Sequence, residues 1–557
     1  MNMEAKNNKT FIDYSKEIAC HFLQTAVTVD DQLVFSPSKS SVGEEILEPD
    51  DSDIGAAAPN PNGSTLVNHY LDYQTLSVEF AKKGIVCSGI MPRKGDSKEE
   101  KVRYITDVIK NADLSIIDWE IGDKGELAQS VIAAVARDDF ESGGQLRLIC
   151  VYTGSNDVNI AQSIEQKIRE AGLTANINNS YIDVSKAAGT SFWRVVLISK
   201  NGSKSGSAEQ DLPDRLIEEF SKITAGLLSN AALSSIANIR NSTHNFLYKF
   251  NKDLDSAYLS HVLGLISSPK MREQAHEVAF DYAVELISEE LKSELQISNL
   301  VKETLGKEIL GSWPKHVNST NTDNFFGIKV GALDEVKFGN ERMQSLLTVT
   351  SESTLTTALD QNPRIAYIEG IVSSVKFFEK EAVELSNSAI EHYLELSAIE
   401  CVRRDVRTIN NHTPTLKQGT IISQNGKYYV CIQPLCDSVR LSSDTSFTFL
   451  RISKATGRDA FTHVLRTSDN YLKLAINECS KRLHIFEFSP NPEYRMIKAV
   501  MSNQKFGFTS VHHGVFEWCG ELKQSTTQAI VNNVASKISR VGLDTFEWLR
   551  FKNKQPQ

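Results

Sequence analysis

Hydrophobic residues in the first third of the chain fall into short β-branched runs, separated by stretches with helical spacing. Four of these runs are TAVTVDD (25–31), LSIIDWE (114–120), LICVYTG (148–154) and VVLISKN (195–201). Runs of this length and composition are typical of buried parallel strands. GIVCSGIM (84–91) predicts one more strand, and the amphipathic stretches between the runs predict crossover helices. The pattern therefore predicts a doubly wound α/β domain with a parallel five-stranded sheet.

The pattern changes twice further along the chain. Apolar residues at helical spacing after Leu212 predict a helical bundle or stalk, either packed within the chain or used as a dimer contact. After it, a long helix is predicted over 375–407, followed by β-rich runs with a hairpin at Asn425–Gly426 and a last helix over 528–552. We therefore expect three parts: 1–205, with an acidic loop insertion at 36–64; 206–312; and an α+β domain at 313–557.

Polar residues follow the four apolar runs at the point where each predicted strand ends. They are Asp30 and Asp31, Asp118, Thr153, and Lys200. Ligands bind at the carboxyl ends of strands in open α/β sheets, so these side chains are expected on one rim. Carboxylates suit Mg²⁺, while a hydroxyl and an ammonium suit phosphoryl oxygens. Taken singly, each residue also fits a plain role; Asp118, for example, fits a helix N-cap or a turn.

This ordered set resembles the receiver domains of two-component response regulators, over roughly residues 15–225. The resemblance implies that Asp118 is the phosphoacceptor and that Asp30, Asp31 and Asp118 hold Mg²⁺. It implies that Thr153 and Lys200 contact the phosphoryl group. It also implies that a histidine kinase, or a related ATP-binding protein, is the partner that phosphorylates Asp118.

The chain departs from the usual receiver pattern around this set. Receivers usually carry Met-Pro after the phosphoacceptor, where this chain has Trp119 and Glu120. Asn201 replaces the proline that usually follows the lysine, and Leu197 stands where a switch aromatic is expected. The chain is thus similar to a divergent response receiver. Such receivers resemble components of bacterial signalling and phage-defence operons.

Charge is distributed unevenly along the chain. The whole chain carries 60 basic and 70 acidic residues, a net charge of −10. Residues 401–557 hold 22 basic and 12 acidic residues (+10), which leaves 38 and 58 (−20) for the first 400. A basic C-terminal domain is expected to meet something acidic, either nucleic acid or an acidic face of the same protein.

Other features indicate an ordinary cytoplasmic globular protein with no membrane partner. No run of about 18 apolar residues is present, and the N-terminus lacks an apolar signal core. The eight cysteines show no metal-ligand spacing, so free thiols are expected. His512 and His513 are interpreted as part of a surface turn.

Three functions follow from these patterns. The first is a phosphoprotein of a phosphorelay, in which phosphorylation of Asp118 is passed to a C-terminal output domain; such a protein is a phosphoacceptor rather than an enzyme. The alternative is a phosphorylation-independent scaffold, or a nucleic-acid-binding protein with a degenerate receiver. A third option is an enzyme with its active site in the C-terminal domain.

Overall fold

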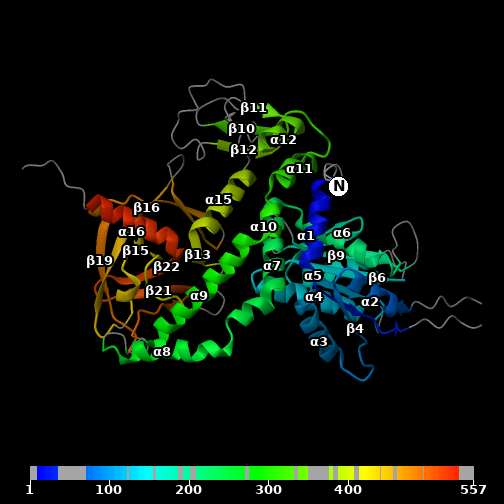
Figure 1. The fold of residues 1–557 in the computed structure, drawn as a ribbon, viewed down its shortest axis with the longest axis horizontal. Helices are drawn as coiled ribbons and strands as arrows, with labels where there is room; N and C mark the ends of the chain where they lie inside the picture. The colour runs from blue at the N-terminus through cyan, green and yellow to red at the C-terminus, as the bar shows by residue number, and fades with distance from the viewer. Residues whose placement is uncertain are drawn as a thin grey trace, which may run out of the picture. The chain divides into compact units, whose positions relative to one another are not determined.

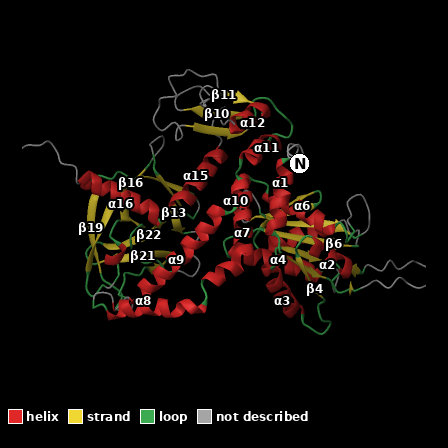
Figure 2. Ribbon diagram, in the orientation of Figure 1, coloured by secondary structure: helices red, strands yellow, loops and turns green. Residues whose placement is uncertain are grey.

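A computed structural model gives the fold of the chain in two units (Figures 1 and 2). The first comprises Met1–Phe250 and Ile287–Lys380, and the second comprises Asn251–Leu286 and Glu381–Gln557. The structure describes residues 9–35, 70–121, 125–154, 159–185, 192–200, 208–269, 272, 275–330, 336–348, 375–379, 387–406, 413–439, 441–455, 461–468, 470–492 and 495–538. The acidic loop predicted at 36–64 lies outside these residues.

The first unit is built on a mixed sheet whose central strands are parallel. In spatial order the strands are β4 (Val86–Ile90), β1 (Thr25–Val29), β5 (Leu114–Ile117), β6 (Arg147–Thr153), β9 (Trp193–Ser199), β8 (Tyr181–Ser185) and β7 (Thr174–Asn178). The parallel part, β4-β1-β5-β6-β9, confirms the predicted doubly wound sheet. The hairpin β7–β8 extends it with antiparallel pairs along the edge of β9. A short parallel pair, β2 (Leu33–Val34) with β3 (Leu71–Asp72), forms a separate two-stranded sheet.

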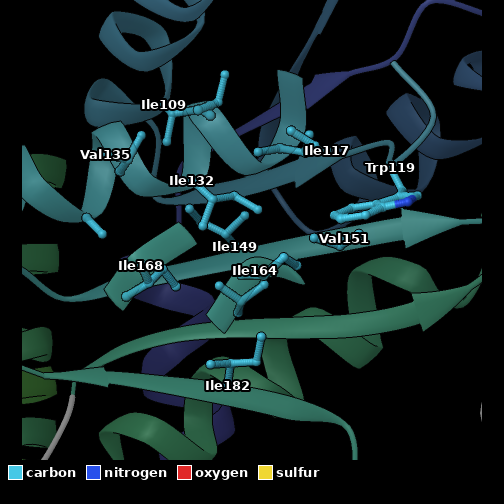
Figure 3. Packing of buried hydrophobic residues seen from close by; sticks show 14 of the residues in the cluster. Ile109, Ile117, Trp119, Ile132, Val135, Ile149, Val151, Ile164, Ile168 and Ile182 are labelled. Carbon is cyan, nitrogen blue, oxygen red and sulfur yellow. The ribbon is translucent and has the colours of Figure 1, made fainter. Parts of the chain in front are cut away.

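Helices cover both faces of this sheet, as alternating strands and helices require. One face packs against α3 (Lys98–Asn111), α4 (Glu126–Glu141) and α5 (Ile160–Glu170). Figure 3 shows isoleucine and valine side chains of these helices, such as Ile109, Val135 and Ile164, meeting Ile149 and Val151 of β6. The other face packs against α1 (Phe11–Phe22), α2 (Tyr73–Lys82) and α6 (Leu212–Thr224).

Local sequence signals fix where several of these helices begin. Thr10 and Asp13 form a reciprocal capping box at the start of α1, and Ser97 and Glu100 form another at the start of α3. Pro213 occupies the first turn of α6, where its missing N–H costs nothing.

A further layer of helices packs on α1 through α7 (Leu227–Lys249) and α11 (Lys307–Val317), with α10 (Asn299–Thr304) against those two helices. The amide of Asn230 on α7 donates a buried hydrogen bond of 2.9 Å to Ser15 Oγ on α1. Arg240 on α7 also contacts both carboxylate oxygens of Asp113, at 2.9 and 3.1 Å. The helical middle segment is thus fastened to the α/β sheet, at least through α7.

The predicted helix over 375–407 is wrong in its first and last parts. Residues Val375–Glu379 form β12, which pairs with β10 (Phe326–Val330) in a small sheet with β11 (Val336–Phe338), next to α12 (Asn340–Thr348). Helix α15 covers only Asn387–Cys401, and β13 (Val402–Asp405) follows it directly. Phe377 packs against the hydrophobic cluster around Phe326, so pairing within the sheet overrides a local pattern that also suits a helix.

The second unit contains an antiparallel sheet that closes on itself. Its order is β13, β22 (Gly514–Leu522), β14 (Thr420–Gln424), β15 (Lys427–Cys431), β16 (Thr445–Lys454), β19 (Leu483–Phe488), β21 (Lys505–Ser510) and β20 (Val500–Ser502). β21 pairs with both β19 and β22, which completes a ring of strands. β17 (His463–Arg466) and β18 (Tyr471–Ala475) branch from β16. The remaining helices are η1 (Lys252–Leu254), α8 (Asp255–Ser267), α9 (Ala275–Ile297, shared with the first unit), η4 (Leu435–Asp437), η5 (Ser480–Arg482) and α16 (Gln524–Ile538).

Aromatic side chains fill the inside of this ring. Phe447, Phe449, Phe486, Phe488 and Phe516 belong to one buried cluster. Their ring centroids lie 4.7–6.1 Å apart, within the range of favourable aromatic pairs. The antiparallel strands, together with helices α15 and α16, confirm the α+β fold predicted for the C-terminal part of the chain.

Turns in the second unit follow the sequence signals closely. The hairpin at Asn425–Gly426 joins β14 to β15, and both residues have positive φ (51° and 72°), as the predicted tight turn requires. His512 and His513 lie in the exposed turn between β21 and β22, as interpreted from the sequence.

The predicted C-terminal helix is found as α16, and residues 539–552 of that prediction lie outside the described residues. Within the described residues, none of the helices is long and apolar enough to cross a membrane.

Candidate functional site

The carboxyl ends of β1, β5, β6 and β9 lie level with one another in the sheet. Val29 of β1 pairs with Ile117 of β5, and Thr153 at the end of β6 pairs with Ser199 at the end of β9. Because the strands are parallel neighbours, the residues that follow them meet at one rim. The structure thereby brings the predicted residues of all four runs to one edge of the sheet.

Backbone hydrogen bonds continue one residue past three of these strands. The N–H of Asp30 donates to Ile90 O (3.1 Å), and the N–H of Asp118 donates to Val29 O (2.9 Å). The N–H of Lys200 donates to Thr153 O (2.8 Å). The three charged side chains therefore start from backbone held by the sheet rather than from loose loops.

Lys200 connects the two buried carboxylates of the site. Its Nζ lies 2.8 Å from Asp30 Oδ2 and 3.1 Å from Asp118 Oδ1. All three side chains are less than a tenth exposed. An ammonium with three donors can bridge two carboxylates in this way, and burial strengthens the attraction.

The second oxygen of each carboxylate accepts a backbone hydrogen bond. Asp30 Oδ1 accepts from the N–H of Gln32 at 2.7 Å, and Asp118 Oδ2 accepts from the N–H of Glu120 at 3.2 Å. These short-range bonds form Asx turns and fix the carboxylate orientation. Asp118 therefore does have the turn role considered from the sequence, in addition to its ion pair.

Charge in the site is not balanced by Lys200 alone. Burial raises the pKa of Asp118 to about 6; attraction by Lys200 opposes the rise, and repulsion by Asp30 adds to it. Burial alone would lower the pKa of Lys200, but attraction by Asp118 and Asp30 outweighs it, and the pKa is raised. One ammonium thus serves two buried carboxylates, with exposed Asp31 adjoining them, so the cluster favours a further cation.

The acidic residues of the cluster fit a divalent metal ion. Asp30, Asp31 and Asp118 each offer a carboxylate oxygen, and these oxygens lie within 4.8 Å of one another. Mg²⁺ takes oxygen ligands and usually keeps several waters, so a few carboxylates with one side open suit it. Asp31 is exposed, which leaves such an open side.

Two further residues of the receiver pattern, Thr153 and Leu197, lie on the neighbouring strands β6 and β9. Thr153 is the last residue of β6 and is buried, on the strand between those that lead to Asp118 and Lys200. Leu197, at the position where receivers usually have an aromatic, is half-buried and packs against the core cluster of the α3–α5 face. No aromatic ring is available at Leu197 to move in response to a change at Thr153.

Trp119 is a structural residue of the site that was not identified from the sequence. It is buried in the core cluster directly after Asp118 (Figure 3). A Cβ at Gly125, which has φ +83°, would lie 2.3 Å from the indole ring. The indole of Trp119 therefore packs directly against Gly125. In the sequence, the only sign of this contact is an isolated glycine before a helical pattern.

A comparison with protein families agrees with this geometry. Residues 22–205 match the family model described as the response receiver domain. The match ends before α6 and does not extend to the helical segment or the C-terminal sheet. Searches of curated proteins and of solved structures each found no significant match. The N-terminal part of the chain is thus a receiver-like domain with an acidic cluster at the rim of its sheet.

Proposed function

We propose that the response receiver domain at residues 22–205 is phosphorylated on Asp118 with Mg²⁺ and passes this change to the rest of the chain. The observation that carries the proposal is the position of Lys200 Nζ between Asp30 and Asp118, with Asp31 beside them. A partner histidine kinase, or a related ATP-binding protein, would supply the phosphoryl group. The family resemblance makes a bacterial signalling or defence operon the proposed setting.

The chemistry assigned to each residue follows from its atoms. An oxygen of Asp118 attacks phosphorus, the P–N bond of a phosphohistidine breaks, and the released imidazole takes a proton from solvent. Asp30, Asp31 and Asp118 would hold Mg²⁺, which supplies positive charge that offsets the charge of the transferring group. The ammonium of Lys200 can turn from Asp118 to a phosphoryl oxygen while it keeps its ion pair with Asp30. The hydroxyl of Thr153 can donate a hydrogen bond to another phosphoryl oxygen.

Phosphorylation would alter the charge balance at the end of β9. Phosphorylation replaces the single negative charge of the Asp118 carboxylate with roughly two negative charges on the acyl phosphate, which compete with Asp30 for the ammonium of Lys200. The chain runs from Lys200 to α6, and α6 packs beside α1. α1 in turn is fastened to α7 by the buried pair Ser15–Asn230. We propose that this row of helices carries the change to the point where the chain enters the second unit, after Phe250.

The alternative of a nucleic-acid-binding C-terminal domain draws less support. Several cations that make this part basic are engaged in ion pairs within it. Arg404 and Lys417 lie near Glu521, Arg466 lies near Asp405, and Lys537 lies near Glu478. Cations paired in this way offer less attraction to phosphates, so we place the regulated step in the receiver domain.

The test is Mg²⁺-dependent transfer from acetyl phosphate, read by intact mass. We expect the wild-type chain to gain one phosphoryl group in Mg²⁺ and none in EDTA. Asp118→Asn should gain none, whereas Asp107→Asn, an exposed carboxylate on α3, should behave as the wild type. A gain that persists in Asp118→Asn would contradict the assignment of the phosphoacceptor.

A further inference from the structure

Helix α8 exposes its apolar side chains instead of burying them. Its sequence DSAYLSHVLGLIS is strongly apolar, yet none of its residues is buried. Leu259 and Leu263, one turn apart, are 55% and 60% exposed. A helix in water normally turns such an apolar stripe toward a core. An apolar stripe without any buried residue therefore requires another surface to cover it.

Helix α9 continues the same arrangement in its first half. Its buried residues among those described are the alanines Ala275 and Ala279. The larger side chains face outward: Phe280 is 64% exposed, and Leu286 is also exposed. Small residues inside and large residues outside reverse the usual order of a folded helix.

The exposed residues of the two helices adjoin each other. The hydroxyl of Tyr258 on α8 donates to the backbone oxygen of Ala279 on α9 at 3.1 Å. The rings of His261 and Tyr282 lie 4.6 Å apart. These two contacts hold the helices side by side. The exposed apolar residues of α8 and α9, together with Leu254 of η1 directly before α8, are here called the α8–α9 surface: Leu254, Leu259, Leu263, Phe280, Val284 and Leu286.

The size of the α8–α9 surface matches one side of a protein interface. At roughly 150–250 Å² for an aromatic side chain and somewhat less for leucine or valine, these six residues and the two tyrosines, each about half exposed, present on the order of 700 Å². A single chain rarely exposes an apolar patch above about 300–600 Å², whereas a standard interface buries about 800 Å² per partner. The surface is thus large enough for a stable dimer.

We infer that the α8–α9 surface is covered by the same surface of a second copy of this chain. Asp255, Asp281 and Glu285 are exposed among its apolar residues, and they disfavour both an anionic lipid surface and nucleic acid. A self-complementary apolar surface needs no further component, and twofold dimers are the commonest assemblies of soluble chains. The dimer is independent of phosphorylation at Asp118, so it stands or fails separately from the proposed function.

The experiment is the mass of the full chain by size-exclusion chromatography with light scattering, over a dilution series. We expect the wild type at twice its chain mass of 62.0 kDa. Leu259→Glu with Leu263→Glu should shift it to a single chain mass. Leu228→Glu, on helix α7 and 62% exposed, is the matched control and should remain dimeric.

A second variant guards against loss of folding. Phe280→Glu changes α9 instead of α8 and should also give a single chain mass, with a circular dichroism spectrum like that of the wild type. A wild type of single chain mass at every concentration would overturn the inference, because some other partner must then cover the surface. A dimer that survives both the α8 and α9 variants would overturn it as well.

Discussion

Arg147 and Asp139 form a bidentate ion pair inside the first unit, at the end of the sheet away from the acidic cluster. The guanidinium donates to both carboxylate oxygens at 2.9 Å, and both side chains are almost fully buried. Trp193 Nε1 donates a third bond to Asp139, at 3.0 Å, and Arg147 also donates to Ile109 O at 2.7 Å. This network joins the first residues of β6 and β9 to α3 and α4.

Removal of Arg147 should destabilise the receiver domain strongly. Arg147→Met leaves the carboxylate of Asp139 buried without its cation, which costs about 3–5 kcal/mol. Hydrogen exchange of β6 peptides in the full chain would measure the change locally. Lys167→Ala, which removes an exposed pair with Glu170, should change the same quantity by less than about 1 kcal/mol. Equal effects would mean that the buried network does not hold the sheet.

Mg²⁺ should stabilise the first unit through the acidic cluster. At ten times its Kd, a ligand that binds the folded state alone adds about 1.4 kcal/mol. We expect Mg²⁺ to raise the unfolding temperature of the wild type and to have little effect on Asp30→Asn or Asp118→Asn. Differential scanning calorimetry with and without EDTA would measure this. Unchanged stabilisation in both variants would place the ion elsewhere.

Replacement of Lys200 should affect transfer and metal binding in opposite directions. Lys200→Met removes the cation that contacts Asp30 and Asp118. Loss of one charged group that stabilises the transferring phosphoryl should slow transfer by about 100-fold. Mg²⁺ should bind more tightly, because it no longer competes with the ammonium for the same carboxylates. Initial rates by intact mass and titration calorimetry give the two values, and weaker Mg²⁺ binding would argue against this competition.

Two glycines allow the packing of Trp119 to be tested with a matched control. Gly84 and Gly125 both have positive φ, 77° and 83°, but a Cβ at Gly84 would meet nothing within 4 Å. Gly84→Ala should therefore cost about 1–2 kcal/mol, for the backbone conformation alone. Gly125→Ala should cost more, because its Cβ collides with the indole, and it should also slow phosphorylation of the neighbouring Asp118. Urea denaturation would compare the free energies of unfolding of the two variants, and intact mass would compare their phosphoryl-transfer rates. Equal losses of stability would mean that the indole of Trp119 moves aside without cost.

The sequence predicted best those features that depend on local apolar runs. The runs ending at Val29, Ile117, Thr153 and Ser199 became the central strands, because buried parallel strands need uninterrupted apolar residues. Their fixed order then brought Asp30, Asp118 and Lys200 together. Local pattern and tertiary pairing agreed here, which is why the residues of the site could be found.

Features that depend on distant pairing were not predictable in the same way. The hairpin β7–β8 lies outside the predicted five-stranded sheet, and β7 is largely exposed and lacks an apolar alternation that would indicate a strand. The local pattern of residues 375–379 predicts a helix, because their pairing partner, β10, lies about 50 residues earlier in the chain. The closing of the C-terminal sheet through β21 depends on contacts that no short window contains.

The division of the chain between the two units has a consequence for its synthesis. The second unit takes Asn251–Leu286 from the middle of the chain and Glu381–Gln557 from its end, with the remainder of the first unit between them. A ribosome therefore releases α8 and the start of α9 well before the strands of their own unit exist. During that interval Leu259, Leu263 and Phe280 are exposed, as they are in the folded chain, and nascent chains on neighbouring ribosomes offer the same helices. In the proposed dimer, pairing of two chains would thus begin during translation, before either C-terminal sheet has closed.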